Sequence, residues 1–277
     1  MRHITSREHP LPKKLLKLQH SARYRRDEGV ALLDGTHLLQ SCLASGWVPE
    51  QLIVSESGSQ HPEIGQLLLH IQKHLSKVDC VMLSDTLFSQ ISAVKTPVGV
   101  LALVNIPRPA MPADTDQTPF WISLEGIQDP GNLGSILRSA AAAGVTDIFL
   151  SAGCADSWSP KTLRAGMGAH FSLRIHENAD LVQIAHRFDG KIVATTLNQA
   201  GNLYQTDLRG AAMFIFGSEG GGVSQKLLEM AQQRVKIPMP GCAESLNVAA
   251  AAAICLFEKV RQEYSIADTD ESSTGSK

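Results

Sequence analysis

The 277-residue sequence has few aromatic residues, at 5 %, and no apolar run of the roughly 18 residues that span a bilayer. Its first residues, MRHITSREHPLPKK, carry charge but lack the apolar core of a secretory signal. The five cysteines never form a CxxC pair, and the ten histidines show no HExxH spacing. We therefore expect a cytoplasmic protein with no membrane anchor, no disulfide framework and no metal site.

The usual nucleotide-binding and hydrolase motifs are also missing. The chain has no GxxxxGK(S/T) phosphate loop, and neither GNLG nor GSEGGG provides the GxGxxG of a dinucleotide-binding fold. Ser218 stands in FGSEG, which does not fit the GxSxG of a serine hydrolase. These absences argue against an NAD-dependent oxidoreductase and against a hydrolase.

The composition fits a globular α/β protein, with 43 % apolar and 19 % charged residues. Short apolar runs alternate with segments of helical periodicity in both halves of the chain, which predicts α/β layers. A proline-rich stretch without periodicity separates the halves. We predict a basic arm, a first α/β domain, a linker, a second α/β domain and a disordered tail, at residues 1–26, 27–106, 107–119, 120–264 and 265–277.

Charge is unevenly distributed, although the net charge is only −2. Within residues 1–26, eight Lys and Arg side chains stand against Glu8 alone. Such a segment either binds nucleic-acid phosphates or is a solvated helix face, and the segment by itself favours neither reading. The candidate phosphate-binding residues are Lys13, Lys14, Arg23, Arg25 and Arg26.

Two loops of the second half combine polar residues with glycine just after predicted strands, where open α/β sheets bind ligands. In the first, Asn132 is a possible helix cap, but Arg138 lies within an alanine-rich helix and requires an anion partner if it is buried. In the second, Gly217, Ser218, Glu219 and Gly220 follow an apolar strand. Glycine allows the backbone to approach a ligand closely, and Glu219 could pair with Arg138.

A third stretch, VKIPMPGCAESLNVAAAAA, joins a short strand to a long helix. Ser245 is a plausible cap for that helix, and Asn247 is a polar side chain at the start of a densely packed alanine segment. By itself, this stretch is equally consistent with an ordinary core helix.

Taken together and in this order, the three stretches resemble the signature motifs of the SpoU family of SPOUT methyltransferases. The first resembles the N…R element, the second the GxEG element and the third the IPM…SLNV element. Ala249 departs from the family pattern, because many members have serine after the asparagine and valine. Residues 17–39 resemble, more loosely, the opening of the substrate-binding domain that is common in this family.

The resemblance implies a trefoil-knotted methyltransferase domain, a smaller α/β domain related to a ribosomal-protein fold, and S-adenosylmethionine as the cofactor. It implies a homodimer formed through the knot region. The implied catalytic residues are Asn132, Arg138, Glu219 and Asn247. The implied cofactor-binding residues are Thr195, Thr196, Leu197, Gly217, Ser218, Gly220, Ile237, Met239, Ser245 and Leu246.

The activity that this resemblance implies is methylation of a ribose 2′-hydroxyl in RNA. Arg138 would hold a phosphate and the 2′-oxygen, Asn132 and Glu219 would hold Arg138, and Ser245 and Asn247 would fix ribose or cofactor. A separate N-terminal domain favours ribosomal RNA. Transfer RNA as the substrate, and a non-catalytic RNA-binding protein with the same fold, remain the alternatives.

Overall fold

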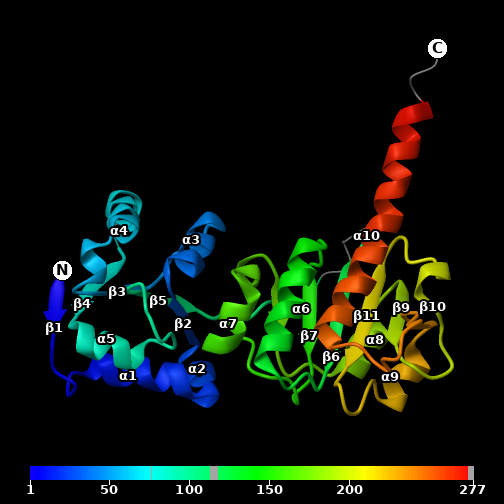
Figure 1. The fold of residues 1–277 in the computed structure, drawn as a ribbon, viewed down its shortest axis with the longest axis horizontal. Helices are drawn as coiled ribbons and strands as arrows, with labels where there is room; N and C mark the ends of the chain where they lie inside the picture. Colours follow the sequence, from blue (N-terminus) through cyan, green and yellow to red (C-terminus); the bar gives the residue numbers. More distant parts are fainter. Residues whose placement is uncertain (76, 113–117, 274–277) are drawn as a thin grey trace. The chain divides into compact units, whose positions relative to one another are not determined.

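The computed structural model describes residues 1–75, 77–112 and 118–273, with side chains described as far as Tyr264. The chain divides into two compact units. The first unit combines Met1–Arg108 with Asp156–Phe171, and the second combines Pro109–Ala155 with Ser172–Lys277. Figure 1 shows both as α/β structures.

The first unit is built on a five-stranded sheet in the order β1-β4-β3-β5-β2. β1, β4 and β3 are parallel, whereas β5 is antiparallel to both of its neighbours, β3 and β2. The strands are β1 (Arg2–Ile4), β2 (Val30–Asp34), β3 (Gln51–Ser55), β4 (Asp79–Leu83) and β5 (Val100–Asn105). The sheet alternation predicted from the sequence is present, with β1 as an additional edge strand.

Helices cover both faces of this sheet. Alternate strand residues pack against α3 and α4 on one face and against α1 and α5 on the other. This arrangement agrees with strands that are buried on both sides and therefore read as continuous apolar runs. The helices are α1 (Pro10–His20), α2 (Ala22–Glu28), α3 (Thr36–Ala44), α4 (Pro62–His74) and α5 (Asp85–Ile91).

The basic segment is part of the first unit and not a separate arm as expected. It forms β1, α1 and most of α2. Leu11, Leu15 and Leu18 of α1 are buried in the core, at the i, i+4, i+7 spacing of an amphipathic helix. The boundary predicted at residue 26 was wrong, because the apolar periodicity of α1 makes this charged segment part of the core of the first unit.

Residues 156–171 pack with the first unit, although a continuous second domain over 120–264 was expected. They contain α7 (Pro160–Gly166), and Trp158, Leu163 and Phe171 are buried in the core that also holds α3 and α4. Trp158 stacks on Trp47, with ring centroids 6.1 Å apart. These large apolar side chains account for the departure of the chain from the second unit.

The second unit is built on a seven-stranded sheet in the order β10-β12-β9-β11-β6-β7-β8, and every neighbouring pair is parallel. The carboxyl ends of these strands therefore share one edge of the sheet. The strands are β6 (Phe120–Glu125), β7 (Asp147–Leu150), β8 (Arg174–His176), β9 (Lys191–Thr195), β10 (Gly201–Asn202), β11 (Ala212–Gly217) and β12 (Gln233–Lys236). β8 and β10 were not predicted, and both are too short to give a periodic signal.

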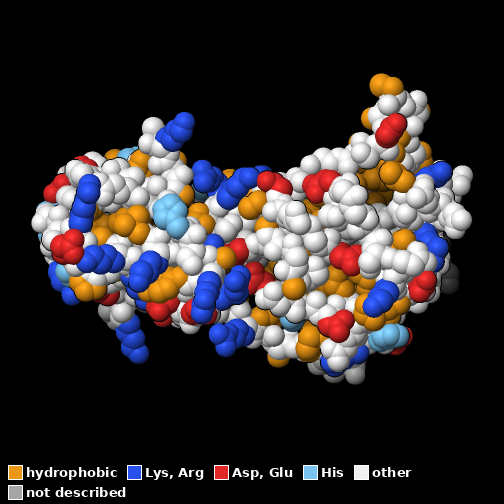
Figure 2. Space-filling model, turned by 90° about the horizontal axis from the view of Figure 1, so that it is seen from below, with side chains coloured by type: hydrophobic (Ala, Val, Ile, Leu, Met, Phe, Trp, Pro, Cys, Tyr) orange, Lys and Arg blue, Asp and Glu red, His pale blue; other side chains and the backbone are white. Residues whose placement is uncertain are grey.

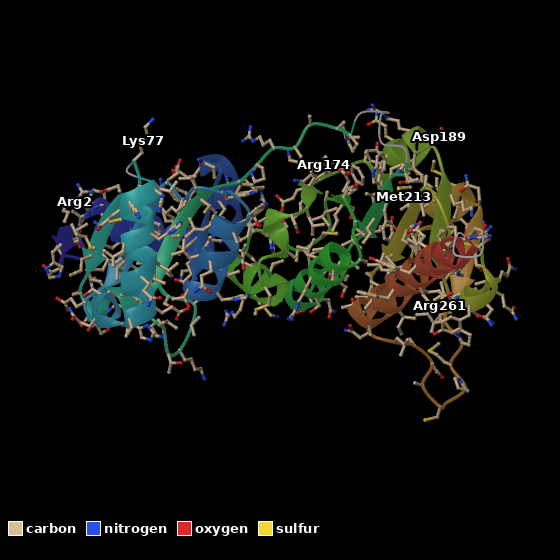
Figure 3. All side chains as sticks on the ribbon, turned by 90° about the horizontal axis from the view of Figure 1, so that it is seen from above. Arg2, Lys77, Arg174, Asp189, Met213 and Arg261 are labelled. Atoms are coloured by element: carbon tan, nitrogen blue, oxygen red, sulfur yellow. The ribbon has the colours of Figure 1, made fainter. Side chains whose placement is uncertain are left out.

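Within the described residues, α-helices flank this sheet. α8 (Leu181–Arg187) and α9 (Gln225–Met230) cover one face, where Met213 and Ile215 of β11 are buried. α6 (Pro130–Ala142) packs with α10 (Val248–Ser273), and α10 extends beyond the sheet in Figure 1. Figure 3 shows Met213 within the sheet and Arg261 on α10.

The disordered tail expected from residue 265 is incorrect as far as Ser273, because α10 continues to that residue. No proline or glycine occurs between Val248 and Ser273, so an established helix can propagate through these polar residues. Residues 274–277 lie outside the described residues. No helix in the described ranges combines the length and apolar character that crossing a membrane requires.

Candidate active site

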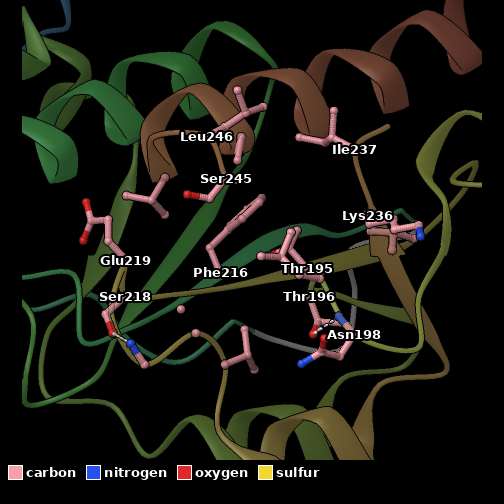
Figure 4. A pocket seen from close by; sticks show the side chains of 18 of the residues that line it. Thr195, Thr196, Asn198, Phe216, Ser218, Glu219, Lys236, Ile237, Ser245 and Leu246 are labelled. Atoms are coloured by element: carbon pink, nitrogen blue, oxygen red, sulfur yellow. Dashed lines mark hydrogen bonds between the residues drawn. The ribbon is translucent and has the colours of Figure 1, made fainter. Parts of the chain in front are cut away.

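A pocket of about 430 Å³ opens at the carboxyl edge of the seven-stranded sheet (Figure 4). Its walls come from the segments that follow β9, β11 and β12 and from the segment that leads into α10. The lining residues are 195–198, 216–223, 228, 235–237, 239, 245, 246, 248 and 251. Residues from three parts of the sequence, 195–198, 216–228 and 235–251, therefore form one cavity, at the edge where parallel α/β sheets bind ligands.

The glycine-rich segment after β11 folds back on itself. The Gly222 amide donates to the Ser218 carbonyl at 2.9 Å, and a Cβ on Gly217 would overlap the Gly222 carbonyl. The far end of this loop is held by Glu125, whose carboxylate accepts from the Ser224 amide at 2.7 Å. Glycine at 217 is thus a steric requirement of this turn.

At one side of the pocket, residues from all three motif stretches are joined by hydrogen bonds. Asn247 Nδ2 donates to Asn132 Oδ1 at 2.9 Å, and Asn132 Nδ2 donates to Glu219 Oε1. Glu219 lines the pocket, and the two asparagines stand behind it. Asn132 and Asn247 come from α6 and from the residue before α10.

Neither helix cap is the one expected. Asp129 caps α6, since its carboxylate accepts from the Asn132 amide at 2.9 Å, and Pro130 occupies the first turn. Asn247 caps α10 in place of Ser245, accepting from the Ala249 amide at 2.9 Å. The missing serine hydroxyl at position 249 leaves this cap intact, because the backbone amide supplies the donor.

Arg138 is not paired with Glu219. Its side chain is exposed, and in the described part of the chain no hydrogen bond or ion pair is found for it. The expected pairing of Arg138 with Glu219 and Asn132 is therefore absent from this structure. Those two residues bind each other, and the guanidinium is left to solvent.

All ten residues assigned to the cofactor by resemblance lie along this pocket: Thr195, Thr196, Leu197, Gly217, Ser218, Gly220, Ile237, Met239, Ser245 and Leu246. Their individual roles stay predictions. Sequence reasoning missed Asn198, Phe216 and Lys236, which also line it. Asn198 follows the predicted Leu197, and Lys236 precedes the predicted Ile237. Their positions next to these residues could have identified them from the sequence.

The candidate phosphate-binding residues of the first unit differ in their surroundings. Arg25 must be removed from the set, because it is 4 % exposed and pairs with Asp156 at 2.5 Å. Lys13, Lys14 and Arg23 form surface ion pairs with Glu8, Glu28 and Asp27. Arg26 is exposed. Figure 2 shows Lys and Arg side chains gathered on the face of this unit that carries α1 and α2.

Within the described residues, no group of three or more His, Cys, Asp or Glu side chains is placed to share a metal ion. The ionisable side chains that line the pocket belong to Glu219 and Lys236.

Comparison with known proteins agrees with this geometry. The model of the SpoU rRNA Methylase family matches residues 119–257, which hold the pocket, and the MRM3-like substrate binding domain matches residues 10–102. Among solved structures, an AdoMet-bound rRNA methyltransferase from Sinorhizobium meliloti is 26 % identical, with a TM-score of 0.81 over 94 % of this chain and 97 % of that one. An RNA 2′-O ribose methyltransferase is 30 % identical, with a TM-score of 0.79 over 95 % and 99 %.

Two relatives in sequence match along nearly their whole length. An uncharacterised tRNA/rRNA methyltransferase of Synechocystis sp. is 34 % identical over 94 % of both chains. The 23S rRNA guanosine-2′-O-methyltransferase RlmP of Bacillus subtilis is 30 % identical over 93 % of this chain and 98 % of its own. The chain described here belongs to the SpoU rRNA methylase family.

Proposed function

We propose that this protein transfers a methyl group from S-adenosylmethionine to a ribose 2′-hydroxyl of ribosomal RNA. The observation that carries the proposal is one pocket lined by the second and third motif stretches, with Asn132 of the first stretch hydrogen-bonded to Glu219 and Asn247 at its side. Ribosomal RNA is favoured over transfer RNA because RlmP, a relative over nearly its full length, is named for 23S rRNA.

The residues present suit this cofactor. The pocket's volume of about 430 Å³ falls in the roughly 300–1,000 Å³ range of small-molecule sites. Leu197, Ile237 and Leu246 offer apolar surface for a purine, and the folded glycine loop leaves backbone open to close approach.

When bound, S-adenosylmethionine supplies an electrophilic methyl group attached to a good leaving group. The protein must then hold the 2′-oxygen in line with that methyl group. Arg138 is suited to this task, because a free guanidinium offers five donors and can clamp a phosphate together with a neighbouring oxygen. Ser245, which lines the pocket, would fix the cofactor or the ribose, and Asn247 would act through its hydrogen bond to Asn132.

Replacement of Arg138 by alanine tests the assignment. We expect Arg138→Ala to lower the rate of methyl transfer to ribosomal RNA by about 100-fold or more, while adenosylmethionine affinity stays near wild type. Ser135→Ala, at an exposed position on the same helix, is the matched control. Incorporation of labelled methyl groups and mapping of 2′-O-methyl marks give the readout, and full activity of Arg138→Ala would exclude this role.

The proposal extends to a homodimer through the region of α10 and to the trefoil knot implied by the family. Support for the dimer comes from apolar side chains on α10 that are left in solvent, with Phe257 46 % and Tyr264 71 % exposed. A large exposed apolar face often marks an interface. Sedimentation of the purified protein, compared with Phe257→Glu, tests this, and a monomeric wild type would contradict it.

A cytoplasmic location also stays a prediction, and it depends on ribosomal RNA being the substrate. Fractionation of cells that express the full chain tests it directly.

A further inference from the structure

The chemistry proposed above releases a proton, and the described residues offer few groups that could take it. Attack by a 2′-hydroxyl on a methyl group leaves the O–H proton to be removed. Guanidinium groups such as that of Arg138 donate hydrogen bonds and do not accept protons, and the asparagine amides are not basic. Among the residues that line the pocket, Glu219 is the only one with a carboxylate side chain.

The hydrogen bonds behind Glu219 have a fixed direction. Asn247 Oδ1 accepts from the backbone amides of Ala249 and Ala250 at 2.9 and 3.3 Å, so its Nδ2 must point away from α10. That nitrogen donates to Asn132 Oδ1 at 2.9 Å. Because backbone amides can only donate, neither side-chain amide can be reversed without losing bonds.

Asn132 Nδ2 therefore faces Glu219 and donates to Oε1. A donor in this position fixes the orientation of the carboxylate. No second partner for this carboxylate is found among the described residues, so Oε2 remains able to accept. Figure 4 shows Glu219 beside Ser218, on the opposite side of the pocket from Lys236.

The other charged groups near this position are already engaged or turned to solvent. Asp129 is engaged as the cap of α6, and Glu125 accepts from the Ser224 amide. Arg138 lies on α6 with its side chain exposed. None of these groups competes with Glu219 for a proton released within the pocket.

We propose that Glu219 accepts the proton of the attacking 2′-hydroxyl, with Asn132 and Asn247 as positioning residues; this rests on the function proposed above. As the oxygen–carbon bond forms and the carbon–sulfur bond breaks, the proton passes to Glu219 Oε2. The sulfonium becomes a neutral sulfide, and the carboxylate becomes a carboxylic acid that later releases its proton to water.

Glu219→Gln is the first test, because glutamine has the same size and keeps an oxygen to accept from Asn132 but is not basic. A lost general base typically costs about 100- to 10,000-fold in rate, and we expect a loss of that size in single-turnover methyl transfer to ribosomal RNA. Adenosylmethionine affinity, measured by calorimetry without RNA, should stay within about threefold of wild type.

Chemical rescue of Glu219→Ala is the second test, since its exposed position lets small carboxylates reach the vacated space. Added formate, acetate and related ions should restore part of the single-turnover rate, and the restored rate should increase with the basicity of the ion. Arg138→Ala should show no such rescue, and neither variant's adenosylmethionine affinity should respond to the added ion.

Near-wild-type transfer by Glu219→Gln would overturn the inference. So would rescue that is equal for all carboxylates, or rescue that restores cofactor affinity instead of rate, because Glu219 would then serve binding alone. A wild-type protein that binds adenosylmethionine but methylates no ribosomal RNA would overturn the proposed function itself, so the two failures are distinguishable.

Discussion

At the scale of single residues, Gly217 determines how the glycine loop turns beside the pocket. A side chain there would overlap the Gly222 carbonyl, so Gly217→Ala forces the loop to move. We expect the free energy of unfolding to fall by about 1–3 kcal/mol, as in other overpacked sites, and adenosylmethionine binding to weaken. Denaturant titration and calorimetry measure the two effects.

Gly220→Ala is the matched control for this prediction. A Cβ at Gly220 meets no atom within 4 Å, so its effect on unfolding should be under about 0.5 kcal/mol. Equal destabilisation by the two variants would show that the cost comes from the lost backbone flexibility of glycine and not from the close approach at Gly217.

The buried His170 is expected to make the stability of the protein depend on pH. The ring is fully buried and its Nε2 lies 2.7 Å from the Ser157 carbonyl; burial lowers the pKa of His170 to about 4, despite the opposing hydrogen bond. The unfolded chain binds this proton more tightly, so the stabilisation is complete above about pH 6.5 and is lost as the pH falls towards 4.

From this shift we expect the free energy of unfolding to be about 2 kcal/mol lower at pH 5 than at pH 8. In His170→Gln, which keeps a donor for Ser157 but does not titrate, most of that difference should disappear. Denaturant titrations at the two pH values provide the measurement, and an identical pH dependence in both proteins would assign the acid sensitivity to other groups.

At the scale of elements, the Arg25–Asp156 ion pair connects α2 with the segment that carries α7. Arg25 also donates to the Leu18 and Gln19 carbonyls, and its side chain is 5 % exposed. Removing one partner of a buried pair costs about 3–5 kcal/mol, and we expect Arg25→Ala to lower the free energy of unfolding by that amount. Denaturant titration of the variant and the wild type gives the difference.

The neighbouring exposed Arg26 gives the comparison. Arg26→Ala should change the free energy of unfolding by under about 0.5 kcal/mol, since surface arginines contribute little. If the two variants unfolded alike, the buried pair would not be what holds residues 156–171 in the first unit.

The elements also show where sequence reasoning succeeded and where it failed. Continuous apolar runs such as 212–217 and 100–105 were readable as strands because burial on both faces leaves almost no polar residue in them. The two-residue β10 and the three-residue β8 are too short for any periodicity. The membership of residues 156–171 in the first unit depends on tertiary packing of Trp158, which no local pattern encodes.

The pocket was predictable to a different degree. The resemblance identified glycines and asparagines in separate stretches of the sequence. The structure brings these residues together at and beside the pocket. The partner of Glu219 could not be predicted, because an exposed arginine and a half-buried asparagine are equally plausible donors until the caps of α6 and α10 are known. Asp129 and Asn247 take those caps and thereby place Asn132 against Glu219.

At the scale of the whole molecule, RNA binding should depend on salt through the face of the first unit that carries α1 and α2. Combined replacement of Lys13, Lys17 and Arg26 by alanine should weaken binding to ribosomal RNA. It should also reduce the slope of log affinity against log salt by about 0.7–0.9 for each phosphate that the variant no longer neutralises. Fluorescence anisotropy over a salt series measures both.

Lys73→Ala is the control, because α4 packs on the opposite face of the same sheet from α1. An unchanged slope in the triple variant would identify these cations as a solvated surface.

Because residues 156–171 pack with the first unit, cutting the chain at one point cannot separate the two units. A fragment that ends at Arg108 would lack Trp158, Leu163 and Phe171 and would expose the core they fill, whereas a fragment that starts at Pro109 would carry those side chains without a place to pack them. Recombination between relatives, natural or engineered, can therefore exchange the halves of this protein only if residues 156–171 are exchanged together with the first half.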